Sequence, residues 1–386
     1  MYVAILGRQP AIGLAEIESK FGSDKVWPVL DDVAMIETGE FDVTRFGSVK
    51  KAGRVLGEFQ KQDRQSDWKK IQGMLASAIS DVDGKITIGL SGYGSGFRAD
   101  DLQRVGLHLK TSLKKQGKSL RLVPNTSVEL STATAHHNKL GLSPNKIEVL
   151  VINTDKKVVV ATSVGSQNIT AYAMRDQNRP ARDMFVGMLP PKLAQTIINM
   201  AVGEKDVRTV LDPFCGTGVV LQEACLMGYD AVGTDLAEKM VGYSKRNLGW
   251  LEEKTRRKFD YRIEMGDAIK YSWDGFDTVA CETYLGQPFS APPSPQKLAE
   301  VKQNCQYIVT GFLKNLARQT KPGARICIAV PAWRRSNGLF EKINIVDSAR
   351  KLGYNLVEFK HADQSELLYH RDNQIVAREL LVLVRS

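Results

Sequence analysis

A turn with two glycines constrains the fold of this chain more than any other stretch. Residues 211–218 read Leu-Asp-Pro-Phe-Cys-Gly-Thr-Gly. The turn follows a short β-prone run, residues 207–211, and precedes residues 219–227, whose apolar positions have helical spacing. A second apolar run, residues 231–234, leads directly into Asp235. The order strand, glycine turn, helix, strand and acid predicts the first βαβ unit of an open α/β sheet.

The glycine pattern limits the ligands that this turn can bind. A dinucleotide fingerprint needs a third glycine, but Leu221 stands three residues after Gly218. The glycine-rich lysine motif of phosphate-binding loops is also missing from the sequence. The first strand ends instead in Asp212, whose carboxylate suits an amine or a cation better than a polyphosphate.

Acidic residues follow three successive predicted strands. Asp212 suits an amine, and Asp235 can accept both hydroxyls of a ribose. Asp267, which follows the strand-like residues 261–264, can accept a hydrogen bond from an adenine amine. Each acid taken alone is equally typical of a helix cap, and Gly-x-Gly alone is equally typical of a tight turn. The three acids together favour S-adenosylmethionine (AdoMet) as the cofactor.

Length, composition and charge set wider limits. A chain of 386 residues with 43% hydrophobic content is expected to form two or three domains. The formal net charge of +10 suggests a polyanionic partner, and more of the excess lies in residues 1–175 than in the rest. No apolar run reaches the length of a membrane span, and residues 1–7 resemble a strand rather than a signal peptide. We therefore expect a cytoplasmic protein that does not bind membranes.

The cysteines show neither a metal-binding nor a disulfide pattern. No two of them have C-x-x-C spacing, and no histidine stands at zinc-ligand spacing from them. We expect reduced, buried thiols and no bound metal. Cys215 in the glycine turn has no histidine near it in sequence, which argues against a nucleophile. The five are Cys215, Cys225, Cys281, Cys305 and Cys327.

The hydrophobic pattern predicts an α+β half followed by the α/β domain. The polar residues 60–70 indicate a subdomain boundary, and Gly92, Gly94 and Gly96 indicate a loop. Before residue 166, we predict strands at 2–6, 33–36, 85–90, 120–123, 146–153 and 158–164, and helices at 13–21, 43–56 and 99–115. After residue 183, we predict helices at 192–200, 301–319 and 339–352, and further strands at 276–281, 324–330, 356–359 and 375–384.

Basic residues mark candidate contacts with nucleic acid. Lys110, Lys114 and Lys118 recur every four residues, so they would share one face of a helix. A solvated surface explains this spacing equally well. Arg334 and Arg335, directly after a predicted strand, have the same two explanations. The candidate RNA-binding residues are Lys110, Lys114, Lys115, Lys118, Arg121, Arg175 and Arg179.

Residues 166–183 predict a linker, because apolar periodicity stops there and arginines cluster. Pro190 and Pro191 then stand at the start of the helix 192–200, which is a common position for proline.

Three of these motifs, taken in order, resemble a known family. The chain is similar in these motifs to the THUMP-domain tRNA guanosine-N2 methyltransferases. The motifs are Arg179-Pro180, then residues 189–194 (Leu-Pro-Pro-Lys-Leu-Ala), then residues 212–218. Residues 146–172 resemble the closing part of the THUMP domain, and residues 369–379 resemble the last strand region of the family. The resemblance is firm from about residue 146 onward and looser before it.

The resemblance implies a fold and a domain order. The fold is α/β, with a C-terminal Rossmann-like class I methyltransferase domain built on a seven-stranded sheet. It is preceded by an α+β ferredoxin-like and THUMP half. The implied domains are a ferredoxin-like region at 1–62, a THUMP-like RNA-binding domain at 63–165, the linker 166–183 and the methyltransferase domain 184–386.

The resemblance also implies an activity, which is AdoMet-dependent methylation of the exocyclic N2 amine of a guanosine in tRNA. The family places an acid, two prolines and an aromatic after the fourth strand, and this chain has Glu282-Thr283-Tyr284-Leu285, followed by Gly286. We expect Glu282 to accept hydrogen bonds from the amine and Tyr284 to stack on the base. The implied cofactor-binding residues are Leu189, Asp212, Pro213, Phe214, Gly216, Thr217, Gly218, Asp235, Leu236, Asp267, Ala268 and Glu282.

The altered motif leaves alternatives open. One is methylation of another nucleic-acid amine, in rRNA or DNA, and another is a non-catalytic tRNA-binding protein that retains AdoMet. The sequence also leaves open which nucleotide is modified, whether one or two methyl groups are added, whether a small activator subunit is needed, and the oligomeric state.

Overall fold

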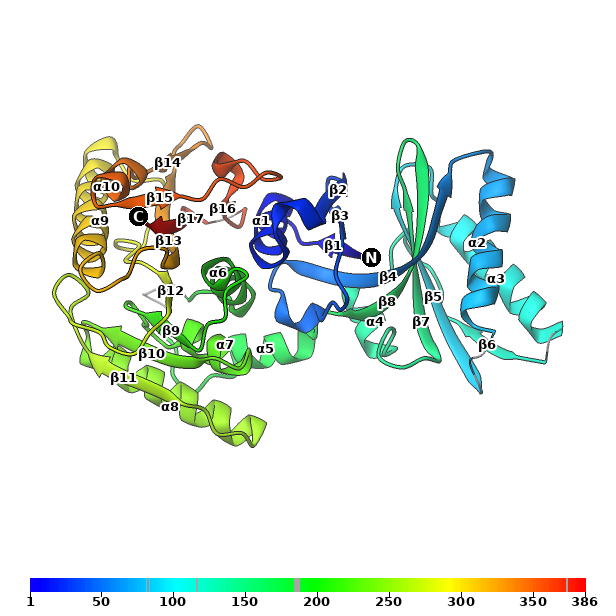
Figure 1. The fold of residues 1–386 in the computed structure, drawn as a ribbon, viewed down its shortest axis with the longest axis horizontal. Coiled ribbons are helices and arrows are strands. Elements are labelled where there is room, and N and C mark those ends of the chain that lie inside the picture. Colours follow the sequence, from blue (N-terminus) through cyan, green and yellow to red (C-terminus); the bar gives the residue numbers. More distant parts are fainter. Residues whose placement is uncertain (81, 83, 116, 184–187, 373) are drawn as a thin grey trace. The chain divides into compact units, whose positions relative to one another are not determined.

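The computed structural model describes residues 1–386 except 81, 83, 116, 184–187 and 373. The chain forms two compact units (Figure 1). Unit 1 comprises Met1–Pro10 and Asp24–Ala171, and unit 2 comprises Ala11–Ser23 and Tyr172–Ser386. The chain therefore begins in unit 1, contributes residues 11–23 to unit 2, returns to unit 1, and ends in unit 2.

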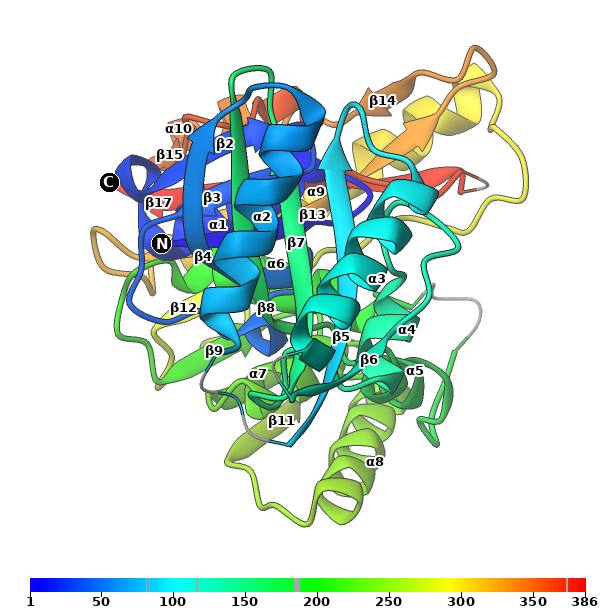
Figure 2. The same ribbon diagram turned by 90° about the vertical axis from the view of Figure 1, so that its right-hand side faces the viewer.

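Unit 1 is built on one sheet of eight strands, in the order β2-β3-β1-β4-β8-β7-β5-β6. Helices α2 and α3 pack side by side on one face of this sheet (Figure 2). Buried Leu75 of α2 and Leu102 and Leu109 of α3 share a core with strand residues such as Ile88 and Val149. The elements are β1 (Tyr2–Leu6), η1 (Ser23–Lys25), β2 (Val26–Leu30), β3 (Val33–Ile36), η2 (Val43–Arg45), β4 (Val49–Gln60), α2 (Arg64–Ala78), β5 (Lys85–Gly94), α3 (Ala99–Lys115), β6 (Ser119–Leu122), α4 (Thr132–His137), β7 (Lys146–Asn153) and β8 (Lys157–Ser166). Strands from both expected N-terminal regions, 1–62 and 63–165, thus share this sheet.

Three expectations for unit 1 are corrected. The predicted helix 43–56 is wrong, because β4 occupies Val49–Gln60 and pairs with both β1 and β8. Strand pairing on both sides overrides the weak local helix pattern. The polar residues 60–70 contain the start of α2, whose first turn is capped by the Asp63 carboxylate. The glycines expected in a loop include two inside β5, where a Cβ on Gly92 would lie 2.7 Å from the Phe97 ring.

Unit 2 is built on a nine-stranded sheet whose main path has the order β11-β10-β9-β12-β13-β17-β15. These seven strands confirm the expected seven-stranded α/β sheet, and β14 and β16 are short additions that pair with β13 and β17. The elements are α5 (Ile169–Gln177), α6 (Pro191–Val202), β9 (Thr209–Asp212), α7 (Val219–Leu226), β10 (Asp230–Asp235), α8 (Glu238–Thr255), β11 (Tyr261–Met265), β12 (Thr278–Glu282), α9 (Pro295–Leu316), β13 (Arg325–Arg334), β14 (Phe340–Lys342), α10 (Val346–Lys351), β15 (Tyr354–Leu356), η3 (Gln364–Glu366), β16 (Leu368–Tyr369) and β17 (Val376–Arg385).

The direction of the strands creates a switch point beside β9. Strands β11, β10, β9, β12 and β13 are parallel, whereas β17 runs antiparallel to β13. The chain builds outward from β9 through β10 to β11, and then returns to place β12 on the other side of β9. Ligands of open α/β sheets bind at the carboxyl ends of the strands at such a switch point. The site is therefore expected beyond Asp212 and Glu282, which end β9 and β12.

Three predictions for unit 2 differ from the structure. The helix predicted at 339–352 is replaced by β14 and the six-residue helix α10. The strand predicted at 356–359 is β15, which ends at Leu356. The expected linker 166–183 contains helix α5, whose Tyr172 and Arg175 are buried. The helical pattern of α5 is hard to recognise because one residue of its buried face is the arginine Arg175. This arginine is buried through an ion pair instead of being exposed.

Helix α1 (Pro10–Phe21) lies between two segments of unit 1 in sequence, yet most of it belongs to unit 2. The Glu18 carboxylate accepts the backbone N–H groups of Lys360, at 2.7 Å, and His361, at 3.1 Å. The Asn199 amide donates to the Glu16 carboxylate at 2.7 Å. These contacts tie α1 to α6 and to the segment before η3.

Candidate cofactor and acceptor site

The glycine turn joins β9 to α7 with its backbone accessible. Gly216 and Gly218 have φ values of 50° and 82°, in the left-handed region that favours glycine. A Cβ on Gly218 would lie 2.9 Å from the Ser244 hydroxyl oxygen, so a larger residue would press on α8. A Cβ on Gly216 would have no neighbour closer than 3.9 Å. The turn therefore packs tightly on one side and leaves Gly216 open for the approach of a ligand.

Asp212 is a buried carboxylate that lacks a cationic partner among the described residues. Its side chain is buried and accepts the Phe214 N–H at 3.1 Å. Burial raises the pKa of Asp212 well above its ordinary value, the negative charges of Asp235 and Glu282 add to that rise, and the Phe214 N–H opposes it. A cation bound at the open turn would compensate this buried charge.

Asp235 braces the same turn from the end of β10. One carboxylate oxygen accepts the Gly216 N–H at 2.9 Å, and the other accepts the Ala237 N–H at 2.9 Å. Burial raises the pKa of Asp235. Asp235 does not cap α8, whose N-cap residue is Ala237 without a side-chain cap. Each carboxylate oxygen keeps a second lone pair for a ribose hydroxyl. Leu236, which follows it, is 72% exposed.

Asp267 follows β11 at the next strand end. Its carboxylate accepts the Ile269 N–H at 3.0 Å and lies 3.5 Å from the Lys270 ammonium. The Gly266 N–H donates to the Asp235 carbonyl at 2.9 Å, which holds the two strand ends together. Ala268 is buried, and its carbonyl accepts from the Asn315 amide at 3.1 Å. The three predicted acids therefore lie at the carboxyl ends of adjacent strands, as an AdoMet site requires.

The remaining cofactor candidates lie in or near the glycine turn and are mostly buried. The Phe214 ring meets Phe312 edge-on, with ring centroids 5.2 Å apart. Leu189 and Thr217 are buried. Pro213 accepts a hydrogen bond from the Thr234 hydroxyl through its carbonyl, at 3.3 Å.

Two residues of α8 hold the turn and were not predicted. Ser244 donates to the Gly216 carbonyl at 2.7 Å. Asn247 donates to the carbonyls of Thr217, at 2.8 Å, and Ala181, at 2.9 Å. Their spacing of three residues places both on one helix face, and small polar residues at core positions of α8 were the signal that could have revealed them.

The candidate acceptor residue Glu282 is held by an arginine. Arg378 of β17 donates from Nε to a Glu282 carboxylate oxygen at 2.7 Å, and the side chains are 5% and 15% exposed. Pro331 of β13 lies opposite Arg378, so the arginine reaches across β13 to β12. Sequence reasoning missed Arg378, although one arginine inside an apolar strand indicates a buried partner.

The loop after Glu282 has a fixed shape despite the missing prolines. The Thr283 N–H and hydroxyl donate to the Ala329 carbonyl at 3.0 and 3.2 Å. Gly286 has a φ of 82°, and a Cβ there would lie 2.7 Å from Val301. Between them, Tyr284 is 40% exposed, and burial of its inner part raises the pKa of its hydroxyl. The loop thus begins with Glu282, whose carboxylate is held by Arg378, and two residues later it presents the accessible ring of Tyr284.

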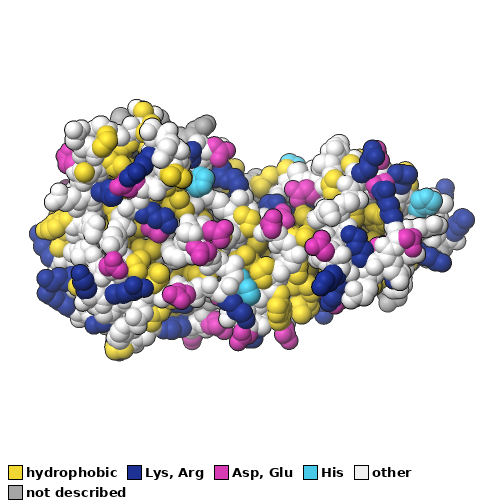
Figure 3. Space-filling model, turned by 90° about the horizontal axis from the view of Figure 1, so that it is seen from above, with side chains coloured by type: hydrophobic (Ala, Val, Ile, Leu, Met, Phe, Trp, Pro, Cys, Tyr) yellow, Lys and Arg dark blue, Asp and Glu magenta, His cyan; other side chains and the backbone are white. Residues whose placement is uncertain are grey.

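The basic candidates of unit 1 divide into exposed and structural residues. Lys110, Lys114 and Lys115 of α3 are exposed, as is Arg121 of β6. On the face drawn in Figure 3, Lys and Arg side chains lie over both units. Lys118 differs, because it follows α3 and its ammonium donates to the carbonyls of Ile79, at 2.9 Å, and of Ser80. Lys118 therefore closes the end of α2 and does not share the helix face with the lysines before it.

Arg175 and Arg179 are buried in unit 2, which corrects their expected role as phosphate ligands. Arg175 donates to both carboxylate oxygens of Glu223 at 2.6 and 3.1 Å, and its guanidinium lies 4.7 Å from the centre of the Tyr172 ring. Arg179 is 3% exposed, and burial lowers the pKa of its guanidinium. Arg175 is thus paired inside the unit, whereas the Nε and Nη1 atoms of Arg179 are buried without a hydrogen-bond partner among the described residues.

The five cysteines lie in the interior of the protein. All five cysteines are buried and free, as predicted. Burial raises the pKa of the Cys215 thiol well above its ordinary value, which disfavours a nucleophilic thiolate. Within the described residues, no group of three or more His, Cys, Asp or Glu is arranged to hold a metal ion. None of the described helices has the length and apolar character that crossing a bilayer requires.

Comparison with known proteins finds a family similar to unit 2. Residues 179–352 match the family described as RMKL-like, methyltransferase domain. This part of the chain is similar to that methyltransferase family. Over 125 residues the chain is 34% identical to the tRNA (guanine(10)-N2)-dimethyltransferase of Pyrococcus abyssi, which covers 31% of this chain and 36% of the relative. Over 170 residues it is 28% identical to the enzyme of the same name from Methanothermobacter thermautotrophicus, covering 43% of this chain and 46% of the relative. The chain thus matches less than half the length of either relative.

A solved structure shares the complete fold. TrmN from Thermus thermophilus superposes with a TM-score of 0.52 and 13% sequence identity, covering 100% of this chain and 99% of that one. At this identity the likeness concerns the fold alone. It agrees with an α/β domain preceded by a separate mixed unit.

Proposed function

We propose that this protein transfers a methyl group from AdoMet to the exocyclic N2 amine of a guanosine in tRNA. The observation that carries the proposal is Asp212, a buried carboxylate without a described cationic partner, beside an open glycine turn at the switch point of a methyltransferase sheet. The tRNA and guanine parts of the proposal rest on the names of the two curated relatives.

The cofactor residues have complementary roles in this proposal. AdoMet supplies a methyl group activated by its sulfonium when it is bound. Asp212 accepts hydrogen bonds from the ammonium of the amino-acid moiety, and Gly216 lets the backbone approach it. Asp235 receives the ribose hydroxyls, while Asp267 and Ala268 border the adenine. The residues that complete the proposed cofactor site are Leu189, Pro213, Phe214, Thr217, Gly218 and Leu236.

The acceptor side of the site must orient a weak nucleophile. The lone pair of a guanine amine is delocalised into the ring, so the base has to be held with that amine aimed at the methyl group. Glu282 accepts a hydrogen bond from the amine through the oxygen that Arg378 leaves free. Arg378 is a positioning residue, since it fixes the carboxylate without itself touching the amine. The exposed Tyr284 ring stacks on the base.

Unit 1 serves as the RNA-holding part in the same proposal. It would correspond to the ferredoxin-like and THUMP-like regions, with Lys110, Lys114, Lys115 and Arg121 as its exposed cations. Phosphate contacts by such lysines give affinity without base specificity. A tRNA substrate also agrees with the expected cytoplasmic location.

The proposal is tested by incubating the protein with methyl-labelled AdoMet and total tRNA, followed by nucleoside analysis. The expected product is N2-methylguanosine or its dimethyl form. Glu282→Gln is expected to reduce labelling at least about 100-fold while AdoMet binding, followed by calorimetry, is retained. Label found only in adenosine or cytidine would refute the base assignment. Absence of label with the unaltered protein, despite AdoMet binding, would instead favour a non-catalytic tRNA-binding protein.

A further inference from the structure

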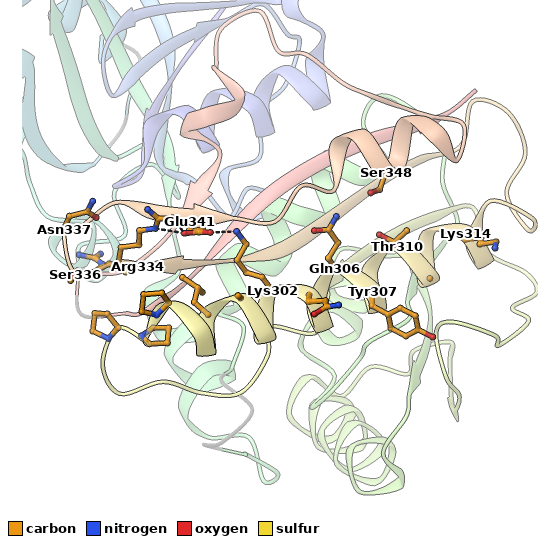
Figure 4. Close-up of a pocket in the computed structure, with 18 residues that line it drawn as sticks. Lys302, Gln306, Tyr307, Thr310, Lys314, Arg334, Ser336, Asn337, Glu341 and Ser348 are labelled. Carbon is orange, nitrogen blue, oxygen red and sulfur yellow. Dashed lines mark hydrogen bonds and ion pairs between the residues drawn. The ribbon is translucent and has the colours of Figure 1, made fainter.

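A groove runs along the outer face of α9, apart from the glycine turn. It has a volume of about 1210 Å³ and lies between α9 and the hairpin of β13 and β14 (Figure 4). From α9 it is lined by Lys302, Gln306, Thr310 and Lys314, which recur every four residues and therefore form one stripe. Arg334 and Arg335 line it from the end of β13.

The lining of this groove, which we call the α9 groove, is positively charged. It includes four basic residues and a single carboxylate, Glu341, so the lining carries a formal charge of +3. Glu341 is shared by two of the cations, Lys302 and Arg335 (Figure 4). Lys314 is exposed, and no salt bridge to it or to Arg334 occurs among the described residues. Two cations in the groove therefore remain without a counter-charge.

Arg334 is prepared to donate further hydrogen bonds. Its guanidinium lies 4.9 Å from the centre of the Phe340 ring, which holds it in place. Its Nε is buried and has no hydrogen-bond partner among the described residues. Such an orphaned donor carries a desolvation cost that an anionic ligand would offset.

The α9 groove begins behind the acceptor loop. Helix α9 starts at Pro295, at the carboxyl edge of the sheet, and its inner face packs on the loop that follows Glu282. A Cβ on Gly286 would lie 2.7 Å from Val301 and 3.4 Å from the Cys305 sulfur. Val301 is buried against this loop, and the next residue, Lys302, lines the groove. A strand lying in the groove would thus pass close to the nucleotide held at Glu282.

The dimensions and chemistry of the groove fit a nucleic-acid backbone. Lys314 follows Lys302 by twelve positions along the helix, a length of roughly 18 Å. Between the two lysines, Tyr307 is 69% exposed and offers a ring on which a base can stack. The Gln306 amide and the Thr310 hydroxyl, which is buried without a partner among the described residues, can bond to phosphate or ribose oxygens.

We infer that the α9 groove binds the sugar–phosphate backbone of the RNA strand that flanks the target nucleotide. The inference rests on the proposed function for the identity of the substrate. A base that is methylated must leave its stack, and holding the flanking backbone lowers the cost of keeping it out. Arg334 and Lys314 each neutralise a phosphate, and Tyr307 stacks on an adjacent base.

The test compares tRNA binding by two variants of the complete chain with equal changes of charge. Lys314→Glu with Arg334→Glu reverses the two uncompensated cations of the groove. Lys245→Glu with Arg257→Glu reverses two exposed cations of unit 2 that do not line it. Filter binding of total tRNA at several salt concentrations should show the groove variant binding roughly tenfold more weakly, with a salt slope lower by about 2. The control variant should change affinity by less than about twofold, and both should bind AdoMet as the unaltered protein does.

Cross-linking gives a second readout that does not depend on folding of a variant. tRNA that carries 4-thiouridine is cross-linked to the unaltered protein, and peptides from residues 302–314 are expected among the products. Unchanged affinity and salt slope of the groove variant would overturn the inference, as would cross-links confined to other segments. If tRNA binds through the groove but no guanosine is methylated, the proposed function fails and this inference stands. If the groove variant methylates guanosine with the same KM for tRNA as the unaltered protein, the proposed function stands and this inference fails.

Discussion

At the scale of single residues, burial decides what each charged side chain can do. Asp212 and Arg175 are both charged residues that are buried in the structure. Arg175 meets Glu223 within the same unit, so its charge is compensated. Asp212 has no such partner among the described residues, which leaves its carboxylate for a ligand. Burying a charge is costly for both residues. Arg175 offsets this cost within the protein and is structural, whereas Asp212 does not and is a candidate binding residue.

The state of Asp212 predicts a pH dependence of cofactor binding. Because burial raises the pKa of Asp212 in the free protein, its carboxyl keeps a proton to higher pH than an ordinary aspartic acid, near 3.9. An ammonium binds only to the ionised form, so AdoMet affinity should fall as pH decreases through that raised pKa. Asp212→Asn should weaken binding at least tenfold at neutral pH and remove this dependence.

The measurement is calorimetric titration of AdoMet between pH 5 and 8, a range that extends about one to four units above the ordinary aspartate pKa. Asp230→Asn is a matched control, since Asp230 lies at the opposite end of β10 and pairs with Arg208. An Asp212→Asn protein with unaltered affinity and unaltered pH dependence would exclude the assigned role.

At the scale of elements, α5 and α7 are joined by a buried ion pair. Arg175 of α5 and Glu223 of α7 are 10% and 1% exposed, and Tyr172 stacks on the arginine. Burial raises the pKa of Glu223, and Arg175 opposes that rise. The pair fixes α5, the segment expected to be a linker, to the methyltransferase unit.

Removing the arginine should destabilise the protein because a buried carboxylate then lacks its partner. Arg175→Met is expected to lower the free energy of unfolding by about 3 kcal/mol at pH 8. The raised pKa of Glu223 then rises further, so protonation relieves the cost and the deficit should shrink toward pH 5. Denaturant unfolding at both pH values measures this change.

Two further variants separate pairing from a loss of packing. Arg175→Met combined with Glu223→Gln should recover part of the stability, since the carboxylate left without Arg175 is then removed. Arg208→Met removes one partner of the exposed pair with Asp230 and should change stability little. A deficit that is equal at pH 5 and pH 8 would argue against the ion-pair explanation.

At the scale of the whole molecule, the two units are interleaved in sequence. Helix α1 belongs mainly to unit 2 although unit 1 lies between them in the chain. Ile17 of α1 is fully buried, and Glu18 caps the backbone of Lys360 and His361. Unit 2 is therefore incomplete when it is cut from the chain at the apparent linker.

A fragment that spans residues 166–386 should consequently be less stable than one that keeps α1. Each buried aliphatic side chain that is lost costs about 1.5–3 kcal/mol, and two lost carboxylate contacts add to this. We expect its melting temperature to lie about 10 °C below that of residues 1–23 joined to 166–386 by a glycine-serine linker. Equal melting temperatures, measured by circular dichroism, would show that α1 is dispensable for the unit.

The parts of the fold that were predictable have strong local signals. The turn at residues 211–218, the strand 146–153 and the helix 99–115 coincide with observed elements, because their period and flanking residues agree with one structure. The strand β4 was missed because its register depends on β1 and β8, both distant in sequence. Arg378 was missed for the same reason, as its partner Glu282 is 96 residues away.

By itself, the sequence determined the α/β domain, the candidate cofactor turn and the position of the altered acceptor motif, since each depends on residues that are neighbours along the chain. Only the tertiary structure decided which charges are compensated. It gave Arg175, Lys118 and Glu282 their partners, left Asp212 without one among the described residues, and brought Lys314 and Arg334 to one groove. Electrostatic compensation depends on distance and burial, and chain folding sets both through contacts that no local pattern records.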